Sequence, residues 1–182
     1  MNIILRNIQE ADLEKIMNWR MLPEVTKYMY TDPELTIEDQ KRWYKRISLD
    51  KNCKYWIIQV NNIDIGLMGL TEIDEKNSRC GWAYYIADTS FRGKGLAGIL
   101  ECNIYDYVFY ELKLNKLWCE VLAFNEKVIY IHKKFGSEIE GVLRQHIYKN
   151  GQFYDVVIMA ILKEKWDNIR KKYDYEKINI EE

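Results

Sequence analysis

The sequence has few of the residues that mark a metal-binding, disulfide-rich or disordered protein. It contains two histidines and four cysteines, and no two cysteines form a CxxC pair. This spacing favours buried thiols in a reducing compartment over disulfides or a metal site. Only two prolines occur in 182 residues, of which 48% are hydrophobic, so long disordered segments are not expected. We therefore expect an ordered domain without a metal.

The chain also lacks an excess of charge and a long hydrophobic run. Its 27 basic and 28 acidic residues give a net charge of −1, which provides no electrostatic basis for binding nucleic acid or an anionic membrane. Acidic residues occur early, and no apolar run is long enough for a signal peptide or a membrane span. We expect a cytoplasmic protein.

The hydrophobic pattern predicts one domain, residues 1–182, ending in a charged helix and tail at 163–182. Asn61-Asn62 and Asn150-Gly151 predict hairpin turns, and Thr36 predicts a helix start. We expect an α+β (mixed α/β) fold with a mostly antiparallel sheet of about seven strands, flanked by helices. A helix at 94–112 should connect the one parallel pair. Strands are expected at 2–6, 55–60, 63–73, 79–87, 117–124, 144–149 and 152–162, and further helices at 10–19, from Thr36 past Ile47, and at 126–135.

The glycine-rich segment Phe91–Gly98 lies between an aromatic-rich strand and the helix predicted at 94–112. Glycines at such a turn let the backbone approach a ligand closely. The N–H groups at a helix start attract anions, and Arg92 and Lys94 add positive charge. The segment therefore predicts a site for a phosphorylated ligand.

Two nucleotide-binding motifs and a plain turn compete for this segment. A Walker A loop needs Ser or Thr after Gly-Lys, but Gly95 follows Lys94. Residues 93–98 satisfy the dinucleotide pattern G-x-G-x-x-G, but they follow a meander of strands and lack the acidic residue that should come about 20 positions later. A tight turn without a ligand is the simplest alternative.

The pattern R-x-x-G-x-A, formed by Arg92, Gly95 and Ala97, resembles the acetyl-CoA pyrophosphate loop of the GNAT superfamily of N-acetyltransferases. The resemblance covers essentially the whole chain. Residues 123–136 look like the family's strand, Asn and helix, and residues 140–166 are similar to the branch with the ribosomal-protein alanine N-acetyltransferases. It implies the GNAT fold, in which acetyl-CoA lies between two splayed parallel strands.

The resemblance also implies which residues hold acetyl-CoA. Backbone N–H groups of the strand before the glycine loop should hold the pantetheine arm and face the thioester carbonyl, and the loop should hold the pyrophosphate. Asn125 looks like the family's Asn beside the pantetheine arm, and it is also a candidate helix N-cap. By this resemblance the cofactor-binding residues are Tyr85, Ile86, Ala87, Arg92, Gly93, Lys94, Gly95, Leu96, Ala97 and Asn125.

The family's usual acid is a Tyr seven residues after that Asn, and here the position holds His132. At ~100° per residue His132 shares the helix face of Asn125, whereas Tyr130 points about 160° away from it. His132 is the first candidate for protonating the leaving thiolate and Tyr130 the second, although a histidine without a role fits equally well. Gly81 occupies the position of the family's basic Glu, which leaves Glu120 as a candidate base acting through water.

Residues 18–43 resemble a subgroup that acetylates the 4-amine of a UDP-linked 4-amino-4,6-dideoxy sugar in the pseudaminic acid pathway. By this resemblance Arg20 meets nucleotide phosphate, and Gln40, Thr71 and Trp82 line the nucleotide-sugar pocket. Gln40 replaces a His of the subgroup. The missing base also fits a sugar amine better than an alkylamine of pKa ~10.4. We expect a small-molecule amine as acceptor, and a homodimer is compatible with the sequence.

Two other function classes fit parts of the sequence. A protein N-terminal acetyltransferase, or one acting on antibiotics or polyamines, matches the C-terminal half equally well. A catalytically weak acetyl-CoA sensor domain would keep the glycine loop and show the His132 substitution and the absent base. A peptide acceptor favours an open groove, whereas a UDP-sugar favours a basic, closed pocket.

Overall fold

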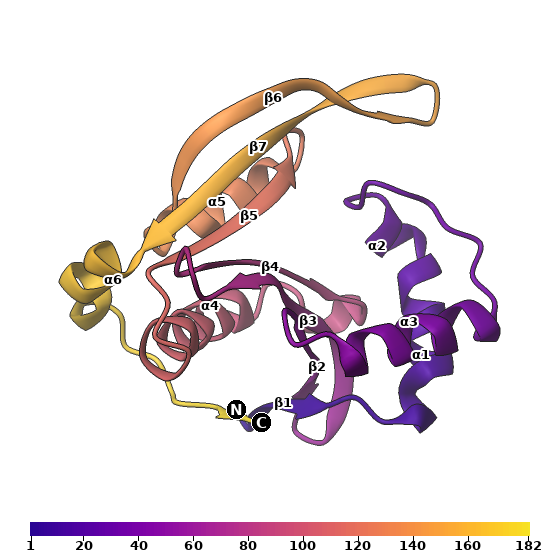
Figure 1. Cartoon of the computed structure of the whole chain (residues 1–182), viewed down its shortest axis with the longest axis horizontal. Coiled ribbons are helices and arrows are strands. Elements are labelled where there is room, and N and C mark those ends of the chain that lie inside the picture. The colour runs from indigo at the N-terminus through magenta and orange to yellow at the C-terminus, as the bar shows by residue number, and fades with distance from the viewer. The chain divides into compact units, whose positions relative to one another are not determined.

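The strands of the computed structural model, which describes residues 1–182, hydrogen-bond in the order β6-β7-β5-β4-β3-β2-β1-β8 (Figure 1). The pairs β4–β5 and β1–β8 are parallel, whereas β1–β2, β2–β3, β5–β7 and β6–β7 are antiparallel. The mixed α/β class and the mostly antiparallel sheet are therefore confirmed, with eight strands instead of about seven. The strands are β1 Ile3–Asn7, β2 Lys54–Val60, β3 Ile63–Asp74, β4 Arg79–Ile86, β5 Lys116–Leu122, β6 Glu138–Lys149, β7 Gln152–Leu162 and β8 Asn179–Ile180.

All the helices predicted from the sequence form, and one short helix, α2, was not predicted. The helices are α1 Leu13–Met21, α2 Pro23–Thr26, α3 Ile37–Leu49, α4 Leu96–Asp106, α5 Glu126–Lys134 and α6 Lys163–Ile169. A π-helical turn at Tyr107–Glu111 continues α4. Thr36 caps α3 as predicted: its side chain accepts from the N–H of Asp39, whose own carboxylate accepts from the N–H of Thr36. This reciprocal capping box fixes where α3 begins.

The chain divides into two compact units. The first comprises Met1–Ile73, Trp82–Lys94 and Ile178–Glu182, and the second comprises Asp74–Gly81 and Gly95–Lys177. Strand β4 contributes to both, because its first three residues, Arg79–Gly81, pair with β5 inside the second unit.

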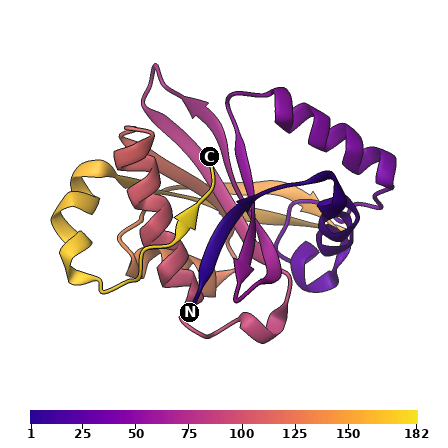
Figure 2. The same cartoon turned by 90° about the horizontal axis from the view of Figure 1, so that it is seen from below.

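In the first unit, helices α1 and α3 lie on one side of strands β2 and β3 (Figure 2). Ile16 of α1 packs with Ile57 and Leu67 in a buried cluster against which Trp19, Trp43, Tyr55 and Tyr85 also pack. The aromatic residues of α1 and α3 are thus only partly buried in the core. Their remaining surface is available to line a pocket.

The C-terminal strand β8 was not predicted, because a two-residue strand carries no periodicity. It pairs with the edge strand β1 in parallel. The carbonyl of Glu181 accepts from the indole N–H of Trp56 at 2.8 Å, and the N–H of Glu181 donates to Leu5. The charged segment 163–182 therefore ends in a short strand.

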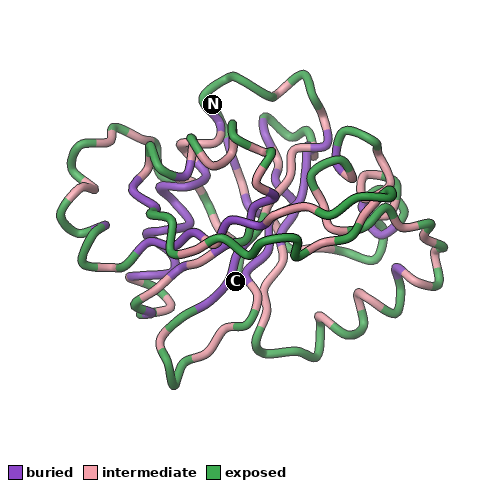
Figure 3. Tube along the Cα trace, turned by 90° about the horizontal axis from the view of Figure 1, so that it is seen from above, coloured by how far each residue is buried: buried purple, intermediate pink, exposed green.

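In the second unit α4 is buried from Leu100 onward, although the spacing of Leu96, Leu100, Ile104 and Val108 favours a helix with a single apolar face. All residues from Leu100 to Phe109 are buried, including three polar ones (Figure 3). Asn103 donates to the carbonyls of Ile99 and Glu176. Asp106 accepts hydrogen bonds from Trp166, Tyr175, Arg170 and Lys177. The polar residues that suggested a solvent-facing side are instead paired inside the protein, as buried polar groups must be.

The β6–β7 hairpin turns at Asn150 and Gly151, as predicted. Both residues have positive φ angles, 50° and 80°, which the two-residue turn of a hairpin requires. Strand β6 starts six residues earlier than predicted, at Glu138, because it is an edge strand whose residues are mostly exposed and show no alternation.

Candidate active site

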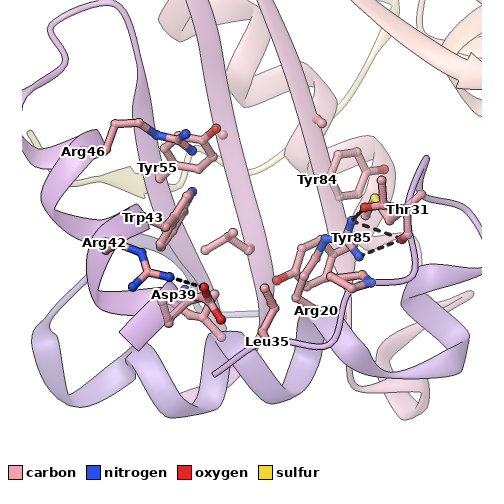
Figure 4. A pocket seen from close by; sticks show the side chains of 17 residues that line it. Arg20, Thr31, Leu35, Asp39, Arg42, Trp43, Arg46, Tyr55, Tyr84 and Tyr85 are labelled. Atoms are coloured by element: carbon pink, nitrogen blue, oxygen red, sulfur yellow. Dashed lines mark hydrogen bonds and ion pairs between the residues drawn. The ribbon is translucent and has the colours of Figure 1, made fainter. Parts of the chain in front are cut away.

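A pocket of about 750 Å³ opens in the first unit between α1, α3 and the strands β2, β3 and β4 (Figure 4). It combines apolar and aromatic walls with a few charged side chains, the usual composition of a small-molecule site. Its lining residues are Ile16, Arg20, Met29, Thr31, Pro33, Leu35, Asp39, Gln40, Arg42, Trp43, Arg46, Tyr55, Leu67, Gly69, Ala83, Tyr84 and Tyr85.

One wall carries Arg20 beside Tyr85 (Figure 4). The Arg20 guanidinium donates to the hydroxyl of Thr31 at 3.0 Å and to the Thr31 carbonyl at 3.4 Å. Burial lowers the pKa of Arg20, while the charge of Asp32 acts in the opposite direction. Arginine stays protonated despite such a shift, so this wall presents a fixed positive charge.

The opposite wall is aromatic and also basic. The rings of Trp43 and Tyr55 meet edge to face, with centroids 5.4 Å apart and planes at 72°. Arg46 and Arg42 come from the same helix, α3, and Arg42 pairs with Asp39. The pocket therefore holds three arginines against one carboxylate.

Two of the four predicted acceptor-binding residues lie in this pocket. Arg20 and Gln40 line it, and Gln40 is 5% exposed. Thr71 and Trp82 are not among its lining residues; Trp82 is buried and stacks on Tyr84 at 5.5 Å.

The side chains of Arg42, Arg46 and Tyr85 also line the pocket and were not predicted to do so. The arginines follow Asp39 at intervals of three and seven residues, so they share a helix face with it. The sequence shows this spacing, but only the position of α3 in the fold shows that this face borders the pocket.

The glycine loop has the conformation that an anion site requires. Gly93 and Gly95 adopt left-handed φ angles of 80° and 79°, and a β-carbon at either position would meet no atom within 4 Å. Gly95 is the N-cap of α4 and supplies no side-chain cap; the N–H of Gly98 donates to the Gly95 carbonyl at 3.2 Å, while the amides of Leu96 and Ala97 keep their hydrogen-bonding capacity. These open, uncapped amides fit a pyrophosphate group.

The side chain of Arg92 has a structural role in the loop. Its guanidinium donates to the carbonyl of Ile86, at 2.6 Å and 3.1 Å, and to the carbonyl of Glu24. It thus anchors the loop to β4 and α2. Lys94 provides the second positive charge near the loop. Its Nζ lies 5.3 Å from the centre of the Phe91 ring.

The strand before the loop is held close to β3. A β-carbon on Gly66 would lie 2.0 Å from the carbonyl oxygen of Tyr85, so only glycine permits this approach. The N–H groups of Ala87 and Asp88 donate to the carbonyl of Ile65, at 2.7 Å and 3.1 Å. The N–H of Ala87 is therefore engaged within the protein, which leaves Tyr85 and Ile86 as the predicted backbone donors to a ligand.

Asn125 and His132 occupy opposite ends of α5. Asn125 is the N-cap residue by position, but its side chain makes no capping hydrogen bond. The second reading from the sequence, that the amide caps the helix, is thus not realised.

His132 is 4% exposed and forms a buried network with α4. Its Nδ1 lies 2.9 Å from Oε1 of Glu101, and the hydroxyl of Tyr105 donates to the other carboxylate oxygen at 2.6 Å. Burial lowers the pKa of His132. Hydrogen bonds to Cys119 and Glu101 and the charge of Glu101 raise it by more, so that the pKa increases from 6.5 to about 10. The carboxylate of Glu101 therefore favours the protonated imidazole.

The other two catalytic candidates are exposed. Tyr130 is 67% exposed on α5, and Glu120 is exposed on β5, where it pairs with Ile158 of β7. No group of three or more His, Cys, Asp or Glu side chains is placed to hold a metal ion, and the four cysteines are free thiols. None of the helices has the length and hydropathy to span a membrane.

Comparison with known proteins identifies a family and several relatives that this chain resembles. Residues 2–138 match the family described as an acetyltransferase (GNAT) domain. The chain is 27% identical over 165 residues to spermidine N(1)-acetyltransferase of Escherichia coli, covering 91% of this chain and 88% of the relative. It is 26% identical over 155 residues to a putative ribosomal N-acetyltransferase of Bacillus subtilis, covering 85% and 81%. The structure of Vibrio cholerae spermidine N-acetyltransferase in complex with CoA and spermine superposes with a TM-score of 0.86 at 26% identity, covering 92% and 99%.

The fold and the uncapped glycine loop define an enzyme that uses an acyl-CoA donor. The chain belongs to the GNAT acetyltransferase family, whose domain matches three quarters of it. It has the GNAT fold and is an N-acetyltransferase with acetyl-CoA as co-substrate. The expected closeness to the amino-sugar subgroup is not supported, because these relatives are named for spermidine and for ribosomal substrates.

The buried pair of His132 and Glu101 predicts how stability depends on pH. The pKa of His132 is higher in the folded protein, about 10, than in the unfolded chain, about 6.5. The resulting stabilisation is complete below about pH 6.5 and is lost as the pH rises toward 10. Urea unfolding between pH 6 and 10 should show this loss, and the double substitution Glu101→Gln with His132→Gln should flatten it. An equal slope in the double variant would show that other groups cause the dependence.

Proposed function

We propose that this enzyme acetylates the primary amine of a small acceptor that carries anionic groups, and that the pocket of the first unit binds this acceptor. The observation that carries the proposal is the charge of the pocket, with Arg20, Arg42 and Arg46 against Asp39. The UDP-linked 4-amino-4,6-dideoxy sugar expected from the sequence is an acceptor of this class, because its diphosphate is anionic and its amine is weakly basic.

The magnitude of the electrostatic effect supports this choice. Two unit charges 8 Å apart interact by about 2 kcal/mol at the effective dielectric constant of a protein surface. A polyamine with several ammonium groups would meet this repulsion from more than one arginine. A diphosphate would gain the same amount and could form charge-assisted hydrogen bonds with the guanidinium groups.

A polyamine is the second candidate acceptor, and the comparisons favour it over a nucleotide sugar. The relatives named above include two spermidine N-acetyltransferases, and the Vibrio cholerae structure is a complex with spermine. Relatives at 26–27% identity support the shared reaction more strongly than a shared acceptor. A ribosomal-protein acceptor rests on the B. subtilis relative alone.

An acceptor panel separates these candidates. We expect the wild-type enzyme to release CoA thiol faster with a UDP-linked 4-amino-4,6-dideoxy sugar than with spermidine or an N-terminal alanine peptide. Arg46→Glu should lower kcat/KM for the sugar at least tenfold and raise it for spermidine, since one charge is inverted. Lys41→Glu makes the same charge change on α3 outside the pocket and should have little effect. A higher kcat/KM for spermidine in the wild type would overturn the anionic acceptor.

The donor is proposed to bind at the loop from Arg92 to Ala97. The backbone N–H groups of the loop would hold the pyrophosphate, with the charge of Lys94 nearby. The N–H groups of Tyr85 and Ile86 and the amide of Asn125 would hold the pantetheine arm. When bound, acetyl-CoA supplies the acetyl thioester.

Substitution of the left-handed loop glycine tests this assignment. Gly95→Ala forces a β-carbon into a φ of 79°, which costs about 1–2 kcal/mol and disturbs the start of α4. Calorimetry should show acetyl-CoA binding weakened about tenfold. Gly141→Ala, at a glycine with ordinary φ and open surroundings, serves as the control. Unchanged affinity in Gly95→Ala would remove this loop residue from the donor site.

The residues of the second unit supply the proposed acid. The amine forms its bond to the acetyl carbon as the carbon–sulfur bond breaks, and the leaving thiolate needs a proton. We propose His132 as the donor of this proton, because Glu101 favours its protonated form and orients it. Gly81 provides no base, and Glu120 is the proposed group that accepts the amine proton through water. An acceptor amine of low pKa reduces the demand on that base.

Separate substitutions of His132 and Tyr130 test the acid. His132→Gln keeps a hydrogen-bond donor near Glu101 but cannot deliver a proton, so kcat should fall about 100-fold or more. Tyr130→Phe removes an exposed hydroxyl and should leave kcat within a factor of two. Far-ultraviolet circular dichroism and melting temperature check that both variants are folded. If His132→Gln retained wild-type kcat, His132 would be a structural residue and Tyr130 the next candidate.

A further inference from the structure

The hydroxyl of Tyr85 is the buried side-chain polar atom that has no hydrogen-bond partner in the chain. Buried hydroxyl groups in native proteins almost always have a partner, and those that lack one need an explanation. Other buried polar side chains of this protein follow the rule: Glu101, Asn103 and Asp106 are all paired. The Tyr85 hydroxyl is therefore a local exception rather than a sign of loose packing.

This hydroxyl belongs to a residue that lines the proposed acceptor pocket. Tyr85 lies on β4 beside Arg20, with Thr31 on the far side of the guanidinium (Figure 4). Burial raises the pKa of Tyr85 well above its usual value of 10, and the charge of Arg20 offsets only part of this. The side chain is a neutral phenol at neutral pH and has a proton to donate.

The two neighbours define what can bind at this corner of the pocket. A guanidinium has donors only, whereas a neutral phenol can donate its one proton and can also accept a hydrogen bond. A ligand group that bonds to the guanidinium and also takes the phenol proton must be an acceptor of hydrogen bonds. A protonated amine has no lone pair and would also be repelled by Arg20. The group that fits is an oxygen of a hydroxyl, carbonyl or phosphate.

We propose that the Tyr85 hydroxyl is a specificity-determining group that donates a hydrogen bond to an oxygen substituent of the acceptor, beside Arg20. This assignment rests on the proposed function and deepens it, because it requires an oxygen-bearing acceptor. It orients the acceptor by its oxygen substituent, so that the amine itself lies away from Arg20. Spermidine, which contains no oxygen, cannot use this contact.

The matched pair Tyr85→Phe and Tyr44→Phe tests the proposal. Tyr44 lies outside the pocket and donates from its hydroxyl to the Ile8 carbonyl at 3.2 Å, so its hydroxyl already has a partner. Tyr85→Phe removes an unpaired buried hydroxyl and should raise the melting temperature of the free protein. Tyr44→Phe leaves a carbonyl without its partner and should lower it. A fall in both variants would show that the Tyr85 hydroxyl is paired within the folded protein.

Kinetics then identify the ligand group. Tyr85→Phe should raise KM for the UDP-linked amino sugar about tenfold, with KM for acetyl-CoA unchanged and a smaller effect on kcat. Its KM for spermidine should equal that of the wild type, and Tyr44→Phe should change neither. An unchanged KM for the sugar, or a wild-type enzyme that acetylates spermidine alone, would overturn the proposal. If the wild type acetylates no amine, the proposed function fails, whereas the opposite melting shifts still decide whether the Tyr85 hydroxyl is held unpaired.

Discussion

The ion pair between Glu101 and His132 is the interaction on which the second unit depends. Helix α4 is buried from Leu100 to its end, so the carboxylate of Glu101 must be paired. His132 supplies that pair at 2.9 Å and links α5 to α4. Removing one partner from such a pair typically costs 3–5 kcal/mol, because the other charge stays buried. The network therefore fixes the helix that begins at the glycine loop and the helix that begins at Asn125.

The same helix ties down the C-terminal segment of that unit through Asp106. Its carboxylate accepts from Trp166 and Arg170, around α6, and from Tyr175 and Lys177 beyond it. The two buried carboxylates of α4 thus hold different parts of the unit. Glu101 holds the candidate acid, His132, and Asp106 holds the C-terminal segment. Because neither can be solvated, the packing around α4 has few alternatives, and the amides at its start are held in place for a ligand.

Capping and turn residues, which act on their sequence neighbours, predicted most helices and strands. Features that depend on contacts between residues far apart in the sequence could not be predicted. Thr36 and the two hairpin turns need only neighbouring residues, so their positions were predicted correctly. The apolar spacing along α4 favours a single buried face, because nothing near Glu101 and Asp106 in the sequence shows that His132 and Trp166 pair with them. For the same reason, nothing near Tyr85 in sequence shows that its hydroxyl stays unpaired, or that Arg20 lies beside it. Strand β8 forms only because the edge of β1 is available.

Family membership and pocket chemistry constrain different halves of the reaction. The donor half depends on backbone geometry: two left-handed glycines, an uncapped helix start and the close approach at Gly66. Few residues other than glycine satisfy such features. Binding of the acceptor depends on side chains of α1 and α3. Substitution of one such side chain can invert a charge in the pocket without disturbing the fold. The arginines of the pocket and the names of the relatives therefore point to different acceptors, since a polycation and a diphosphate demand opposite charges from the same wall.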